Sequence, residues 1–279
     1  VVCGEKYGIS PESDIYIYKI FTGTGSTQTY WIIDALNEAI FVDKCKIIHL
    51  SFGGINYNDK TIINLLNIAI NNNILIISSA GNEGPAYGTI SFPGTLPCVL
   101  SVGSTSKEIF SIYEYSSRGP AMVDKNTLLT KPNTFAPGEN IIGLSFDKLN
   151  DPTLSIPIKI FKNGSSIATA IITGFISLCL SIETTEDELT NWNLNKLIDV
   201  VQNTNIFLPE LNNEYEKFSG LFNPQGLLGY ILNNYLNKND KYNIHIYNYD
   251  YSFNSKNINN KENNNPKLNY PDEVLYTTK

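Results

Sequence analysis

The sequence lacks several features that would place it in other classes of protein. No apolar run approaches the ~20 residues needed to cross a bilayer, so we expect no transmembrane helix in this region. Lysine and arginine form no cluster and the net charge is -7, which argues against nucleic-acid binding. No Gly-x-Gly-x-x-Gly follows a strand-like segment, so a Rossmann-type nucleotide binder is only a remote alternative.

Cysteine and histidine are also scarce. The 4 cysteines are widely spaced and form no Cys-x-x-Cys pair, which argues against a zinc site. They lie in or beside apolar segments, which favours buried free thiols over the disulfides that a secreted protein could form. Of the 2 histidines, His49 lies in an apolar strand and is expected to be a hydrogen-bonded core residue, whereas His245 lies in a polar, repetitive tail. The cysteines are Cys3, Cys45, Cys98 and Cys179.

The sequence does contain a regular alternation of strand-like and helix-like segments. With 279 residues and 42% hydrophobic content, the chain can bury one sizeable core. The alternation predicts an α/β fold with a doubly wound, mostly parallel sheet. The expected strands are residues 15–21, 46–52, 74–80, 98–103 and 133–136, and the expected helices are residues 29–42, 60–72, 166–181, 186–202 and 224–236.

The composition changes near residue 238, which predicts two regions. Residues 1–237 carry the alternating pattern and are expected to form the folded domain. In residues 238–279, asparagine is interleaved with lysine and tyrosine, and ten of the 30 residues from Lys241 to Tyr270 are asparagine. Such low-complexity sequence cannot bury a core of its own, so we expect a disordered tail or linker.

Three segments place small polar residues where a catalytic site can form. Residues 164–169 open a long apolar segment and put the Ser166 hydroxyl near a helix N-terminus, where free N–H groups favour developing negative charge. Residues 74–85 are an apolar strand ending in Gly-Asn-Glu-Gly-Pro, and residues 47–54 are another ending in Ser-Phe-Gly-Gly. Parallel sheets bind ligands at the carboxyl ends of their strands, and glycines there leave backbone free to pair with an extended peptide. Taken singly, Ser166 also fits a helix cap and Asn82 a turn.

Taken in chain order, from residues 47–54 through 74–85 to 164–169, the three segments resemble the subtilisin-like serine proteases. Residues 16–33 look like that family's strand, substrate-edge loop and following helix. Tyr115–Gly119 and Lys131–Gly138 look like its Phe-Ser-x-Arg-Gly and Lys-Pro-Asp-x-x-Ala-Pro-Gly segments, and residues 225–228 like its closing Gly-x-Leu stretch. The resemblance covers about residues 1–237 and is closest to the site-1 protease branch.

Two motifs of the family are absent from the sequence. The family uses Asp, His and Ser in that chain order, and neither its Asp-Ser/Thr-Gly nor its His-Gly-Thr-x-Val-Ala-Gly motif occurs here. Val1–Gly4 look like the end of the helix that carries the histidine. The resemblance therefore implies a fragment that begins just after the base and lacks the first strands of the sheet, with Asp and His upstream of Val1.

The resemblance implies a serine-type endopeptidase. Ser166 would attack the scissile carbonyl, and its backbone N–H and the Asn82 side-chain amide would hold the oxyanion. A polypeptide substrate would lie as an extra strand between two edges of the domain. The residues implied to contact it are Gly25, Ser26, Thr27, Ser51, Phe52, Gly53, Ser79, Ala80 and Gly81.

One departure from the family pattern supports a second class of function. Ala170 stands where the family has proline, four residues after Ser166, and this restores a backbone N–H that needs a partner. Together with the absent Asp and His, the change leaves open a catalytically inactive scaffold that binds partners. Upstream Asp and His motifs would favour the enzyme, and a complete reading frame without them would favour the scaffold.

Cofactors, further partners and location follow only from the resemblance. No cluster of metal ligands is visible, so no cofactor is expected, although some relatives carry structural calcium. A pro-segment inhibitor is an expected partner beside the polypeptide substrate. The expected location is the secretory pathway, with the protein secreted or membrane-associated.

Overall fold

The computed structural model describes residues 1–5, 8–23, 25–54, 58–106, 111–123, 127–144, 159–181, 193–211, 213–216 and 218–235. These residues lie within one unit, Val1–Tyr242. The expected low-complexity tail, residues 238–279, lies outside the described residues, as do residues 186–192 of one expected helix.

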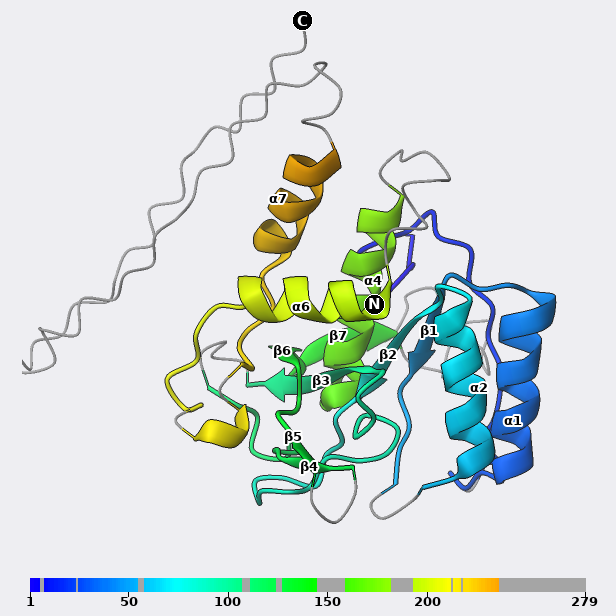
Figure 1. The fold of residues 1–279 in the computed structure, drawn as a ribbon, viewed down its shortest axis with the longest axis horizontal. Coiled ribbons are helices and arrows are strands. Elements are labelled where there is room, and N and C mark those ends of the chain that lie inside the picture. The colour runs from blue at the N-terminus through cyan, green and yellow to red at the C-terminus, as the bar shows by residue number, and fades with distance from the viewer. Residues whose placement is uncertain are drawn as a thin grey trace, which may run out of the picture. The chain divides into compact units, whose positions relative to one another are not determined.

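A four-stranded parallel sheet forms the centre of this unit (Figure 1). Its strands run in the order β1 (Ile47–Leu50), β2 (Leu75–Ser79), β3 (Leu100–Thr105) and β6 (Thr134–Pro137). Every residue of β2 and β3 is buried, which is why these two strands read as almost unbroken apolar or small-residue runs. The parallel sheet and its helices confirm the predicted α/β class.

Helices cover the sheet, and one of them packs against all four strands. That helix is α4 (Ser165–Leu180), whereas α2 (Lys60–Asn71) packs on β2 and α1 (Thr29–Asn37) packs on α2. Helix α1 runs on into a π-helical turn, η1 (Glu38–Val42). Within the described residues, none of the helices is both long and apolar enough to cross a membrane.

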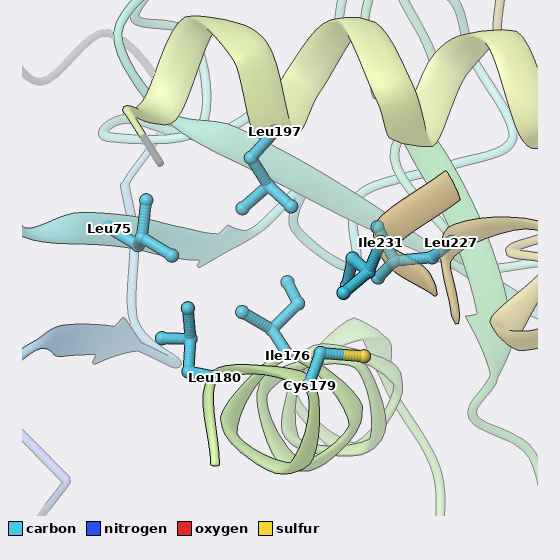
Figure 2. A pocket seen from close by; sticks show the side chains of 7 residues that line it. All are labelled: Leu75, Ile176, Cys179, Leu180, Leu197, Leu227 and Ile231. Carbon is cyan, nitrogen blue, oxygen red and sulfur yellow. The ribbon is translucent and has the colours of Figure 1, made fainter. Parts of the chain in front are cut away.

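Two more helices, α6 (Leu194–Thr204) and α7 (Pro224–Tyr235), close the core beside α4. Figure 2 shows side chains from β2, α4, α6 and α7 pointing toward one another around a void of only about 10 Å³. A void of that size holds at most one water, so this region is packed core and not a ligand site. The residues around it are Leu75, Ile176, Cys179, Leu180, Leu197, Leu227 and Ile231.

The predicted strand at residues 15–21 is wrong. Among the described residues the segment has no ladder partner, and an isolated bridge joins its last residue, Phe21, to Thr27. The physical reason is a groove of about 1170 Å³, lined on one side by this segment and on the other by β1. Across that groove the segment cannot exchange backbone hydrogen bonds with the sheet, whatever its own β-propensity.

Two small antiparallel pairs of strands are not predicted by the sequence pattern. Strand β4 (Ala121–Met122) pairs with β5 (Leu128–Leu129), and β7 (Ile141–Leu144) pairs with β8 (Lys159–Lys162). The first pair is two residues long on each side, and the second joins segments that are well separated in sequence. Strands as short as β4 and β5 show no recognisable periodicity, and a local pattern cannot indicate that β7 pairs with a segment as distant in sequence as β8.

Lys131 is a lysine whose side chain is buried in the interior of the domain. Its side chain is 2% exposed, and its Nζ donates to the Val99 carbonyl at 2.6 Å and to Asn133 Oδ1 at 2.8 Å. Burial lowers the pKa of Lys131 from its ordinary 10.5 to about 7, because desolvation disfavours the ammonium form. Between these two pH values the unfolded chain binds more protons than the folded chain at this group, so its contribution makes stability rise with pH.

We therefore expect the wild-type protein to gain stability relative to Lys131→Met as the pH is raised from 7 to 10. Methionine has a similar length but no ionisable group, so the variant lacks this proton linkage. Urea unfolding at several pH values measures the difference in the free energy of unfolding. Replacing the exposed Lys60 by methionine is the control and should leave the pH slope unchanged. A wild-type-minus-Lys131→Met difference that is flat with pH would contradict the assignment.

Candidate active site

The start of helix α4 is held in place by an unusual backbone conformation. Gly164, which precedes the helix, has φ +134°, a value that L side chains rarely adopt. A Cβ at this position would lie 3.3 Å from the Asn82 side chain. Glycine therefore allows the helix start and Asn82 to approach each other.

Asn82 is oriented by the first residue of α4. Its Oδ1 accepts hydrogen bonds from the Ser165 backbone N–H at 2.8 Å and from Ser165 Oγ at 3.1 Å. With Oδ1 occupied in this way, the amide presents Nδ2 as its donor. Ser165 Oγ also accepts from the Gly81 N–H at 3.2 Å, and Ser165 is fully buried. The sequence motifs predict no role for Ser165, although its place directly before Ser166 could have indicated one.

Ser166 lies in the first turn of α4, where the backbone N–H groups have no partner inside the helix. Its hydroxyl lies 3.3 Å from the carbonyl oxygen of Ser51, to which it donates. In return, Ser51 Oγ lies 3.3 Å from the carbonyl oxygen of Ser166. The structure thus brings together Ser166, Asn82 and the end of β1. In the sequence, Ser166 lies 84 residues or more from each of the other two, so only the fold creates this grouping.

A carboxylate supports the loop that carries Asn82. Glu83 Oε2 accepts from the Asn82 backbone N–H at 2.8 Å, from Ser117 Oγ at 3.0 Å and from Ser91 Oγ at 3.1 Å. Gly81, at φ +112°, lets this carboxylate fold back, because a Cβ there would lie 2.4 Å from Glu83 Oε2. The loop is therefore fixed by charge-assisted hydrogen bonds on one side and by Ser165 on the other.

The two predicted substrate edges lie near each other. In the first, the Thr22 N–H donates to the Ser26 carbonyl at 2.9 Å and so closes a tight turn, and Thr27 bridges back to Phe21. The second edge begins at Ser51, and its Phe52 ring packs edge-on against Phe21 at 6.4 Å between ring centroids. The turn includes three predicted contact residues, Gly25, Ser26 and Thr27, and the second edge includes Ser51, Phe52 and Gly53.

The expectation that both glycines after Phe52 leave free backbone is wrong at Gly54. Its N–H donates to the Phe92 carbonyl at 3.2 Å, and its carbonyl accepts from the Phe92 N–H at 3.1 Å. At Gly53 a Cβ would lie 2.8 Å from the Phe92 carbonyl oxygen. The Gly-Gly pair therefore serves close packing on residues 91–92, a contact that sequence patterns do not reveal.

The predicted pocket walls at the end of β2 are covered. Ser79 is 4% exposed and Ala80 is fully buried, and the Ala80 backbone bonds to Val102 and Ser91. Gly81 is buried too, with its carbonyl accepting from the Ser117 N–H. Their contact with a substrate stays a prediction.

His49 is hydrogen-bonded, as predicted, but it has intermediate exposure and also belongs to the site. Its Nε2 lies 2.5 Å from Ser51 Oγ, and its Nδ1 lies 2.9 Å from Thr173 Oγ1 on α4. Burial lowers the pKa of His49 to about 4, because the charged imidazolium would be desolvated. The ring is therefore neutral at physiological pH. The strand pattern alone could not show that Ser51 lies within reach.

The cysteines and acidic residues that the structure describes are candidate disulfide partners and metal ligands. All four cysteines are free and partly buried, which agrees with the predicted free thiols but not with full burial. Burial raises the pKa of Cys179 to about 11, so this thiol stays protonated. Within the described ranges, histidine, cysteine, aspartate and glutamate form no group of three that could hold a metal.

Sequence comparison relates this chain to known proteases. A family model described as "Subtilase family" matches residues 3–227. The chain is 29% identical over 180 residues to the subtilisin-like protease SBT6.1 of Arabidopsis thaliana, covering 64% of this chain and 16% of that protein. It is 30% identical over 179 residues to the membrane-bound transcription factor site-1 protease of Mus musculus, covering 63% of this chain and 16% of that protein. The chain thus spans about a sixth of the length of these curated relatives.

Structural comparison supports the same fold. The protease domain of PatA superposes with a TM-score of 0.64 at 20% sequence identity, covering 84% of this chain and 78% of that one. At this identity the likeness concerns the fold alone. It agrees with the parallel sheet and with the place of α4 across all four strands.

Proposed function

Because the chain belongs to the subtilase family of serine peptidases, we propose that Ser166 is the nucleophile of a serine endopeptidase. The observation that supports this most directly is the arrangement of Asn82 at the start of α4. The Ser165 N–H donates to the amide oxygen of Asn82 at 2.8 Å, which leaves Nδ2 as the donor that we propose for the oxyanion. Such a donor, fixed before the reaction begins, stabilises an oxyanion without reorganisation.

The proposed reaction is acyl transfer. Ser166 Oγ bonds to the carbonyl carbon of the scissile peptide as its proton passes to a histidine, and the oxyanion accepts from Asn82 Nδ2 and from the Ser166 N–H. The histidine then protonates the leaving amine, and water hydrolyses the acyl-serine by the same route in reverse. We propose that this histidine and the aspartate that orients it lie upstream of Val1, as the family resemblance implies.

The substrate is proposed to be a polypeptide that binds as an extended strand between residues 25–27 and residues 51–53. Backbone pairing supplies affinity in this mode, and side-chain pockets supply specificity. No acidic side chain lies among the predicted wall positions, so a strict preference for a basic residue is not part of the proposal. A pro-segment inhibitor and a secretory location are proposed in the same way, as the family resemblance implies, and no cofactor is part of the proposal.

The experiment that tests this function begins with the reading frame upstream of Val1. The proposal requires Asp-Ser/Thr-Gly and His-Gly-Thr-x-Val-Ala-Gly motifs there, and hydrolysis of an unstructured protein such as casein by the protein that carries them. If the complete reading frame holds neither motif and the purified protein leaves casein intact, the inactive binding scaffold is the better description.

A further inference from the structure

Glu83 and Ser117 bond to each other in two directions beside Asn82. The Glu83 backbone N–H donates to Ser117 Oγ at 3.1 Å, and Ser117 Oγ donates to Glu83 Oε2 at 3.0 Å. This reciprocal pair fixes both the backbone and the side chain of Glu83, in the way that a capping box fixes the first turn of a helix. Ser117 is fully buried, so the surrounding core sets its position.

The same carboxylate oxygen reaches the backbone of Asn82. Glu83 Oε2 accepts from the Asn82 N–H at 2.8 Å and from Ser91 Oγ at 3.1 Å, in addition to its bond from Ser117. Hydrogen bonds to a carboxylate are about twice as strong as those between neutral groups. The Asn82 backbone is therefore tied, through one oxygen atom, to two serines from other segments of the chain.

The segment that carries Ser117 is itself fixed by a buried ion pair. Arg118 Nε donates to Glu216 Oε1 at 2.6 Å and Arg118 Nη2 donates to Glu216 Oε2 at 2.5 Å, and the Glu216 side chain is fully buried. A two-bond pair of this kind restricts geometry as well as adding energy. The Ser117 N–H also donates to the Gly81 carbonyl at 3.1 Å. Ser117 is therefore a fixed support for the loop that carries Asn82.

Two different groups thus hold the two ends of Asn82. Ser165 bonds to its side-chain oxygen, and Glu83 bonds to its backbone N–H. With both ends held, the amide Nδ2 has little freedom to move. A donor of this kind works only when it lies within about 0.5 Å of its productive position, so the backbone contact matters as much as the side-chain contact.

We propose that Glu83 and Ser117 are positioning residues that act on peptide hydrolysis through Asn82. In this role neither group contacts the reacting atoms, and both keep Nδ2 where the oxyanion forms. Because this role rests on the proposed function, loss of either side chain should lower turnover and leave KM nearly unchanged. The expected loss is about 10- to 100-fold, because a displacement of about 1 Å can cost about 100-fold.

A double-mutant cycle with Asn82→Ala tests the proposal in the protein that carries this chain and the upstream Asp and His. Glu83→Ala and Ser117→Ala should each lower turnover of a fluorogenic peptide when Asn82 is present. When Asn82 is already alanine, each should lower it by less than about twofold, because no amide is left to displace. Partial unfolding would lower turnover by the same factor in both backgrounds. Equal losses in the two backgrounds would therefore overturn the positioning role.

Two further variants sharpen the test. Glu83→Gln keeps the side-chain length and one oxygen acceptor, so it should retain more turnover than Glu83→Ala. Glu114→Gln is the matched control, because Glu114 is exposed on the segment that carries Ser117, and it should keep the wild-type rate. Wild-type turnover by Glu83→Ala would also overturn the proposal. A wild-type protein that hydrolyses no peptide would overturn the proposed function and this role together, whereas an active wild type with equal losses overturns the positioning role alone.

Discussion

Ser166→Ala should abolish peptide hydrolysis in the protein that carries this chain together with the upstream Asp and His. The expected loss in turnover is about a million-fold, the magnitude found when the nucleophile of subtilisin is removed. The loss is this large because nucleophile and base act as a unit and neither works without the other. Substrate binding should change little, since Ser166 contributes one hydroxyl to a long extended interface.

The measurement is turnover of a fluorogenic peptide, with binding of a non-cleaved peptide measured separately. Ser181→Ala is the control, because Ser181 follows the last residue of the same helix, is exposed, and its hydroxyl donates to the Leu178 carbonyl. That variant should keep full activity. Retention of more than about a thousandth of the wild-type rate by Ser166→Ala would mean that another group carries the reaction.

Asn82→Ala should lower turnover about 100- to 1000-fold with little change in KM. The reason is that Nδ2 is placed to bond to the oxyanion, which exists only in the transition state and the intermediate. Removing such a donor costs about 2.7–4 kcal/mol of transition-state stabilisation, a value taken from the corresponding asparagine of subtilisin. Full activity of Asn82→Ala would show that the amide does not face the oxyanion.

Two further variants separate orientation from chemistry. Asn82→Asp keeps an oxygen for Ser165 to bond but replaces the donor by an acceptor, so it should be at least as inactive as Asn82→Ala. Asn72→Ala removes an exposed asparagine that bonds to the Ile68 carbonyl at the end of α2, and it should leave turnover unchanged. A KM effect without a turnover effect would place Asn82 in substrate binding instead.

The strands and helices that pack against the sheet could be predicted because their patterns are local. Buried β2 reads as an apolar run, and α4 reads as a long apolar helix opened by glycine and serines. The segment at residues 15–21 has the same apolar character but forms no ladder, because a groove separates it from β1. Propensity cannot report whether a partner strand lies within reach.

The same division holds at the candidate site. The fold class and the importance of Ser166 and Asn82 could be predicted from the amino-acid sequence, because motif order and residue type carry that information without coordinates. Only the tertiary structure decided that Ser165 orients Asn82, that Glu83 anchors the loop and that His49 reaches both Ser51 and Thr173. Hydrogen bonds of about 2.5–3 Å form only when the strands, loops and helices that carry these groups pack in the right positions. No local sequence pattern encodes that packing.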